Sequence, residues 1–193
     1  MSRPILVGIL AFQGDFAKHQ EAFKRLGCEV RLVKSVAALE GLDCLVMPGG
    51  ESSTIYRFLR AEQFEQPLIQ FAQEHPVWGS CAGMILVGRE IANDDFVRPL
   101  GLIDMTTSRN TYGRQYESFI ATGRFVPDTD AEELEMVFIR APKVEQVGED
   151  VRVLGKCGDE ITIVQQDKVV ATSFHPELTD STRFQEYFLS LID

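Results

Sequence analysis

The sequence lacks any cluster of histidine and cysteine, the residues that most often bind transition metals. Its 193 residues include three histidines and four cysteines. The cysteines are widely spaced and form neither a CxxC pair nor a Cys/His cluster, so we expect no metal site. Cys44 lies in an apolar run and is predicted to be a small buried residue.

Long apolar runs and an excess of positive charge are also absent. No run approaches the ~20 residues of a transmembrane helix, and the apolar residues 5–10 are soon followed by Gln13, Asp15 and Lys18, which favours a first strand over a signal peptide. The formal net charge is -10 at pH 7, and such a surface repels phosphate backbones. We therefore expect a cytoplasmic protein that binds neither membrane nor nucleic acid.

The composition is that of an ordinary globular protein, with 45% hydrophobic and 25% charged residues. A chain of this length suits one domain and is long enough to bury a sizeable core. No internal repeat, low-complexity tract or long linker divides it, so residues 1–193 are predicted to form a single domain.

Apolar runs alternate with amphipathic segments in the first half of the chain. In residues 15–26, Phe16, Phe23 and Leu26 fall on one side of a helix, and Gly27 is its expected stop. Strands are expected at residues 5–10, 30–33, 44–47 and 77–81, and further helices at 54–59, 67–74 and 84–90.

The second half is richer in strands and ends in a helix from about Thr182. The alternation of strands and helices predicts an α/β fold, with an open, mostly parallel twisted sheet and helices on both faces. Ligands bind such sheets at the carboxyl ends of the strands. The expected strands are residues 102–106, 115–122, 136–140, 151–154, 161–165 and 169–174, and the apolar face of the last helix is Phe184, Phe188, Leu191 and Ile192.

A candidate nucleophile is Cys81, within Gly79-Ser80-Cys81-Ala82-Gly83 between an apolar strand and a helix. This G-x-C-x-G pattern is typical of a nucleophile elbow. The sharp turn strains the central residue, and glycines two positions away remove side chains that would collide. The free N–H groups and dipole of the following helix favour a thiolate. A buried structural cysteine in a Gly-rich turn is the alternative.

The candidate base is His175, which follows the apolar strand 169–174. Residues two apart in an extended chain point the same way, so Glu177 can bind one imidazole nitrogen while the other faces Cys81. His-Pro-Glu alone is more often a turn. His19 is interpreted as a surface or boundary residue of the first helix, and His75 as an ordinary residue at a helix end.

Pro48-Gly49-Gly50-Glu51 lies between an apolar strand and a helix and is a candidate oxyanion site. Paired glycines leave backbone N–H groups accessible to a developing negative charge, and Ala82, directly after the nucleophile, is assigned to the same site. A phosphate-binding loop is less favoured because the Lys of a Walker loop is missing and Glu51 is present. A plain turn remains an alternative.

The segments PGGES, GSCAGM and HPE together resemble the class I (triad) glutamine amidotransferases. Within them, the chain is most similar to the glutaminases that serve pyridoxal 5'-phosphate synthase. Departures are mild: Ser80 stands where threonine is expected, and Tyr112 where phenylalanine is common. The segments that carry the closer resemblance are residues 10–14, 109–115, 118–119, 138–142 and 171–179.

The resemblance implies a flavodoxin-like fold and a glutaminase that releases ammonia through a Cys81 thioester, with His175 and Glu177 completing the triad. It implies that L-glutamine binds against Gly49, Gly50, Glu51, Arg109, Ile139 and Arg140, with Arg109 a sensible partner for the α-carboxylate. The implied partner is a (β/α)8-barrel synthase subunit that makes pyridoxal 5'-phosphate, and no cofactor or metal is needed. Gln13, on the loop after the first strand, is predicted to help gate the oxyanion site when that partner docks.

Three alternatives remain open on the sequence. A glutaminase of another synthase, such as that of imidazole glycerol phosphate, would share the three catalytic segments. A non-catalytic regulatory subunit of the same fold would have lost a triad residue, and none is lost. A stress hydrolase or chaperone with a cysteine elbow would not need the Gly-Gly segment and the His-Pro-Glu as well.

Overall fold

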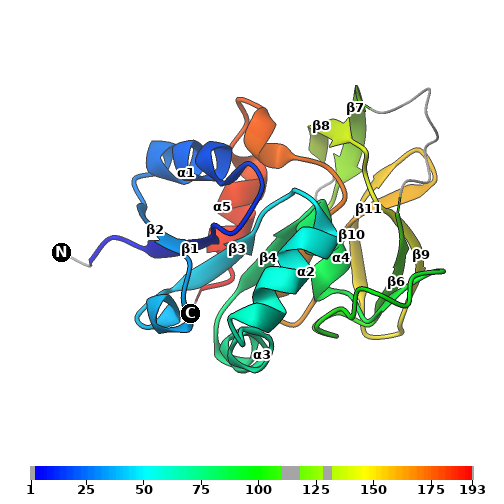
Figure 1. Cartoon of the computed structure of the whole chain (residues 1–193). Coiled ribbons are helices and arrows are strands. Elements are labelled where there is room, and N and C mark those ends of the chain that lie inside the picture. The colour runs from blue at the N-terminus through cyan, green and yellow to red at the C-terminus, as the bar shows by residue number, and fades with distance from the viewer. Residues whose placement is uncertain (1–2, 110–117, 128–131, 193) are drawn as a thin grey trace.

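The structure is a computed structural model that describes residues 3–109, 118–127 and 132–192. Within these ranges, nine strands form one mixed sheet and three strands form a second (Figure 1). The large sheet contains β1 (Leu6–Leu10), β2 (Glu29–Val33), β3 (Cys44–Met47), β4 (Val77–Ser80), β7 (Ser118–Phe125), β8 (Glu132–Ile139), β10 (Arg152–Cys157), β11 (Glu160–Gln166) and β12 (Val169–Thr172).

Five neighbouring strands of the large sheet are parallel. Its order is β2-β1-β3-β4-β12-β11-β10-β7-β8, with parallel pairing from β2 to β12 and antiparallel pairing beyond. In register, Met47 pairs with Gly79 on one side of β4, and Thr172 pairs with Ser80 on the other. The residues that follow β3, β4 and β12 therefore meet at one edge of the sheet, as predicted for a ligand site.

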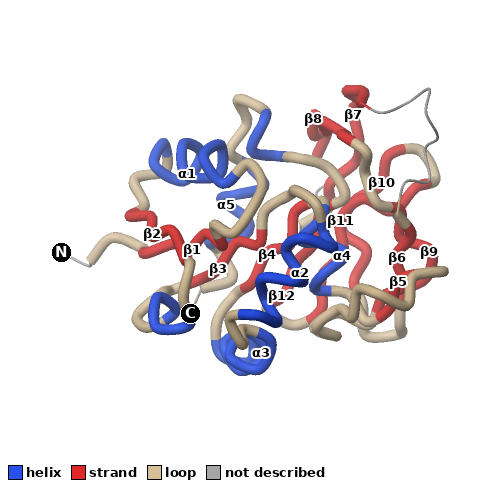
Figure 2. The backbone as a smooth tube through the Cα atoms, in the orientation of Figure 1, coloured by secondary structure: helices blue, strands red, loops and turns tan. Residues whose placement is uncertain are grey.

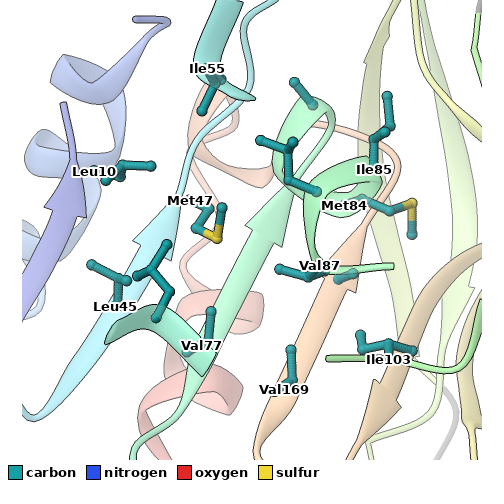
Figure 3. Close-up of a cluster of buried hydrophobic side chains, with 14 of the residues drawn as sticks. Leu10, Leu45, Met47, Ile55, Val77, Met84, Ile85, Val87, Ile103 and Val169 are labelled. Carbon is teal, nitrogen blue, oxygen red and sulfur yellow. The ribbon is translucent and has the colours of Figure 1, made fainter. Parts of the chain in front are cut away.

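Helices cover both faces of the parallel strands, which confirms the predicted α/β architecture (Figure 1). Side chains alternate between the faces: in β3, Leu45 and Met47 pack with α2, α3 and α4, whereas Cys44 and Val46 pack with α1 and α5. Figure 3 shows part of the first of these two cores. The helices are α1 (Phe16–Arg25), α2 (Ser52–Ala61), α3 (Glu65–Glu74), α4 (Ala82–Val87) and α5 (Arg183–Leu189), and the 3-10 turns are η1 (Val36–Leu39) and η2 (Pro176–Leu178).

The small sheet consists of β5 (Glu90–Ile91), β6 (Met105–Ser108) and β9 (Lys143–Val147), far from the N-terminus in Figure 2. The expected helix 84–90 is wrong at its end, because Gly88 stops α4 and Glu90 begins β5. Leu191 and Ile192 lie beyond α5 rather than in it. Residues 115–117 of one expected strand lie outside the described residues. No helix in the described ranges is long and apolar enough to cross a bilayer.

Candidate active site

Cys81 lies at a strained turn between β4 and α4. Its φ of 51° and ψ of -104° are sparsely populated by residues other than glycine. A Cβ on Gly79 would lie 2.5 Å from the carbonyl oxygen of Gly83, and a Cβ on Gly83 would lie 2.0 Å from that of Met47. The turn therefore needs both glycines, as the elbow pattern predicted.

His175 and Glu177 form a buried pair behind the cysteine. His175 Nδ1 lies 2.7 Å from Glu177 Oε1, and the Ser80 hydroxyl donates to Glu177 Oε2 at 3.4 Å. The pair forms through the 3-10 turn η2 rather than through the extended chain from which it was predicted. Because the carboxylate accepts the Nδ1 proton, Nε2 is left as the nitrogen available to the thiol.

The electrostatics of the pair favour the charged forms of both side chains. Burial lowers the pKa of His175, but the side chains of Cys81 and Glu177 outweigh this effect and raise that pKa to about 10. Burial raises the pKa of Glu177, yet His19 and His175 hold it well below its usual range. Near neutral pH the pair is therefore an imidazolium and a carboxylate.

A cavity of about 270 Å³ opens in front of Cys81. Glu177 is absent from its lining because it lies behind His175. Gly49 lies close to both catalytic side chains: a Cβ on it would lie 2.5 Å from His175 Cε1 and 3.4 Å from Cys81 Cβ. The predicted residues that line the cavity are Gln13, Gly49, Gly50, Glu51, Cys81, Ala82, Arg109, Ile139, Arg140 and His175.

Comparison with known proteins agrees with this geometry. Residues 9–193 match the model of the SNO glutamine amidotransferase family. The chain belongs to that family. It is 44% identical over 189 residues to pyridoxal 5'-phosphate synthase subunit PdxT of Halalkalibacterium halodurans, covering 97% of this chain and 95% of the relative. It is 44% identical over 191 residues to the protein of that name from Thermus thermophilus, covering 96% and 97%.

One solved structure supports the same assignment, and a second shares the fold. A crystal structure of a glutamine amidotransferase is 42% identical, with a TM-score of 0.90 and coverage of 96% of this chain and 98% of the other. The structure of PurLQS from Thermotoga maritima has a TM-score of 0.73 at 13% identity, which shows the fold alone.

In this amidotransferase the loop after β1 supports the Gly-Gly segment. Gln13 Oε1 accepts a hydrogen bond from the backbone N–H of Glu51 at 2.7 Å. A Cβ on Gly14 would lie 1.8 Å from the carbonyl oxygen of Gly49, so that carbonyl faces the β1 loop. The structure thus places Gln13 in direct contact with the segment that it was predicted to gate.

The side chain of Arg109 reaches the cavity but is also held by the protein. It forms an ion pair with the almost buried carboxylate of Asp94, and it donates to the Ser52 hydroxyl at 3.2 Å. Asp94 also accepts the backbone N–H groups of Phe96 and Val97 at 2.8 and 3.1 Å. Neither Asp94 nor Ser52 was predicted as part of the site. Residues 110–115, which carried much of the closer resemblance, lie outside the described residues.

The interpretation of His19 as a surface or boundary residue was wrong. Its side chain is completely buried, and its Nε2 lies 3.3 Å from Glu177 Oε1. The sequence contained a signal for this burial, because His19 follows Phe16 by three positions and precedes Phe23 by four, on the apolar face of α1.

Proposed function

We propose that residues 1–193 form one glutaminase domain that hydrolyses L-glutamine to L-glutamate and ammonia, and that the ammonia serves a pyridoxal 5'-phosphate synthase. The observation that carries this proposal is the strained Cys81 at the floor of a cavity, with the His175–Glu177 pair beside it. The close relatives are named as subunits of that synthase. A nucleophilic thiol must stay reduced, so we place the reaction in the cytoplasm.

The chemistry follows from the roles that the geometry permits. The Cys81 sulfur attacks the side-chain amide carbon of glutamine, and the imidazolium of His175 protonates the leaving ammonia. Water then attacks the carbon of the γ-glutamyl thioester while His175 takes a proton from it, and the carbon–sulfur bond breaks to release glutamate and regenerate the Cys81 sulfur. Glu177 keeps the imidazole oriented and stabilises its positive charge. These steps use groups of the protein and water and require no metal or cofactor.

The amide oxygen becomes negatively charged in each tetrahedral intermediate. Gly49, Gly50 and Ala82 line the cavity beside Cys81. Their backbone N–H groups are the donors that we assign to this oxyanion. Glu51 and the Ile139–Arg140 segment complete the glutamine site. The carbonyl oxygen of Ile139 lies 3.8 Å from Cys81 Sγ, so this segment closes the cavity next to the reacting atom.

The proposal is tested by measuring glutamate release from glutamine. The chain should release glutamate when it is mixed with the (β/α)8-barrel synthase subunit that we propose as its partner. Absence of glutamate release both alone and with that subunit, from a folded protein, would overturn the proposed function.

Arg109→Ala should raise the Michaelis constant for glutamine about 10- to 100-fold and change turnover little. The guanidinium in the cavity is the proposed partner of the α-carboxylate, and a charge-assisted hydrogen bond is worth about 1.5–3 kcal/mol. Arg89→Ala is the matched control, because Arg89 pairs with Asp104 outside this cavity. Steady-state kinetics separate the two constants, and a loss confined to turnover would contradict the assignment of Arg109.

Gln13→Ala should weaken activation of the glutaminase by the synthase partner. We propose that docking fixes the Gly49-Gly50 peptide in its donating orientation, and Gln13 is the side chain that holds the adjacent N–H of Glu51. Loss of one oxyanion donor costs roughly 100- to 1000-fold in rate. A Gly49-Gly50 peptide that is not held in its donating orientation would therefore explain a low glutaminase activity of the chain without its partner. The measurement is the ratio of glutaminase rates with and without the partner.

The control for this experiment is Gln70→Ala, an exposed change on α3 outside the cavity. Cys81 in the Gln13 variant should still react with a small thiol reagent at the rate of the unsubstituted chain. Activation that survives Gln13→Ala, or a free chain as fast as the complex, would contradict the gating role.

A further inference from the structure

His19 lies on α1, which packs on the face of the sheet behind the catalytic pair. Its side chain has no exposed surface, and neither does that of Glu177. The ring packs edge-on against the indole of Trp78, with centroids 4.8 Å apart and an interplanar angle of 77°. The position of His19 is therefore fixed by the core on one side, and its Nε2 faces the triad on the other.

Two imidazoles share one oxygen of Glu177. His175 Nδ1 lies 2.7 Å from Oε1, and His19 Nε2 lies 3.3 Å from the same atom. The His19 contact is longer and bent away from ideal hydrogen-bond geometry, so it is the weaker of the two and mainly electrostatic. In an interior without screening water, a polar group at this distance still acts strongly on a carboxylate.

We propose that His19 is a positioning residue of the active site, whose buried ring holds the Glu177 carboxylate in the rotamer that orients His175. Glu177 is then fixed from three elements: by His19 on α1, by Ser80 at the end of β4, and by His175 beyond β12. The inference rests on the proposed glutaminase chemistry, since it assigns His19 to the same triad.

A purely structural role for His19 does not explain this arrangement. Burial of an imidazole is costly unless the ring is paired, and an apolar side chain would pack against Trp78 without that cost. Among the described residues, Glu177 is the only ion-pair partner of His19. His19 also helps to keep the pKa of Glu177 low, which preserves the negative charge that the imidazolium of His175 requires.

The test compares two substitutions in the complex with the synthase subunit. His19→Phe keeps a ring against Trp78 but removes the N–H, and His19→Gln keeps an N–H donor at about the reach of Nε2. We expect His19→Phe to lower turnover on the order of 10- to 100-fold, as for outer partners of metal-bound histidines, with the Michaelis constant nearly unchanged. His19→Gln should recover most of that loss.

Phe23→Leu is the matched control for packing. Phe23 lies on the same helix, and its ring is 6.3 Å from that of Trp78, but its side chain has no polar group that could bind Glu177. This variant should lower the melting temperature and leave turnover unchanged. Full turnover in His19→Phe, equal turnover in His19→Phe and His19→Gln, or a turnover loss in Phe23→Leu as large as that in His19→Phe would each overturn the inference.

A second measurement does not use His19→Phe and therefore tests the inference even if that variant does not fold. In ¹⁵N-histidine NMR at pH 7, Nε2 of His19 should carry a proton, and its resonance should shift in Glu177→Gln. An Nε2 without a proton, or a resonance whose chemical shift is unchanged in Glu177→Gln, would overturn the inference. If the unsubstituted complex releases glutamate, these outcomes overturn the role of His19 but not the proposed function. If the unsubstituted complex releases no glutamate, the proposed function itself is overturned.

Discussion

Cys81→Ala should abolish glutamate release, with a loss of at least about 1000-fold in turnover. The thioester cannot form without the sulfur, and removal of a nucleophile typically leaves only the small contribution of binding and oxyanion donors. The protein should remain folded, because alanine also has a Cβ and meets the same strain at a φ of 51°. Glutamate release and the melting temperature are the two measurements.

Cysteine labelling gives the same prediction a second readout. A glutamine analogue with an electrophilic carbon at the amide position should modify Cys81 and no other cysteine. Cys157→Ala is the matched control, since this partly exposed cysteine lies on β10, outside the cavity, and its removal should leave both activity and labelling intact. Labelling of Cys28, Cys44 or Cys157 instead would remove Cys81 from the mechanism.

The edge of the sheet that carries the site was predictable because its strands are continuous apolar runs. Residues 44–47 were predicted as a strand, and β3 has the same bounds. Parallel strands end at a common edge, so three motifs far apart in the chain could be assigned to one site from the sequence alone. The pairing of Met47 with Gly79 and of Thr172 with Ser80 confirms that reasoning.

Several antiparallel strands were harder to predict, because they are exposed on one side and mix polar with apolar residues. The sequence of β9 (Lys143–Val147), KVEQV, contains no apolar run, and it was missed. In β8 (Glu132–Ile139) the buried Leu134, Met136 and Phe138 alternate with other residues, but only residues 136–140 were predicted. A period of two, rather than a continuous run, was the signal in this strand.

Contacts between distant polar residues were the least predictable part of the site. Asp94 pairs with Arg109, and His19 contacts Glu177, because the elements that carry them pack together. No local sequence pattern indicates that these elements are neighbours. His19 is one example: its place on the apolar face of α1 was a signal for burial, but it was interpreted as a surface or boundary residue. The partner of a buried polar side chain becomes visible only once the elements are packed.

Glu177→Gln should lower turnover by roughly 100- to 10,000-fold with a smaller change in the Michaelis constant for glutamine. The amide keeps the shape of the carboxylate but lacks the charge that stabilises the imidazolium, and it can hold the wrong tautomer of the ring. The pKa of His175, raised to about 10 in part by Glu177, should fall in the variant. Steady-state kinetics and the pH titration of His175 by NMR measure the two effects.

The same substitution should change how stability depends on pH. Folding lowers the pKa of Glu177, so its ionised form stabilises the fold above the pKa of an unfolded glutamate, about 4.3, and this contribution is lost as the pH falls toward the folded value. Glu177→Gln has no carboxyl group to protonate. Its melting temperature should therefore decrease less steeply on acidification than that of the unsubstituted chain.

Glu132→Gln is the matched control for the loss of one negative charge. Glu132 begins β8 and pairs with Arg183 at 3.2 Å, where both side chains are partly exposed and outside the cavity. A surface ion pair of this kind is worth about 0–1 kcal/mol, so the control should retain turnover and acid sensitivity. If Glu177→Gln were as active as this control, Glu177 would be a turn residue, and His175 would be oriented by some other group.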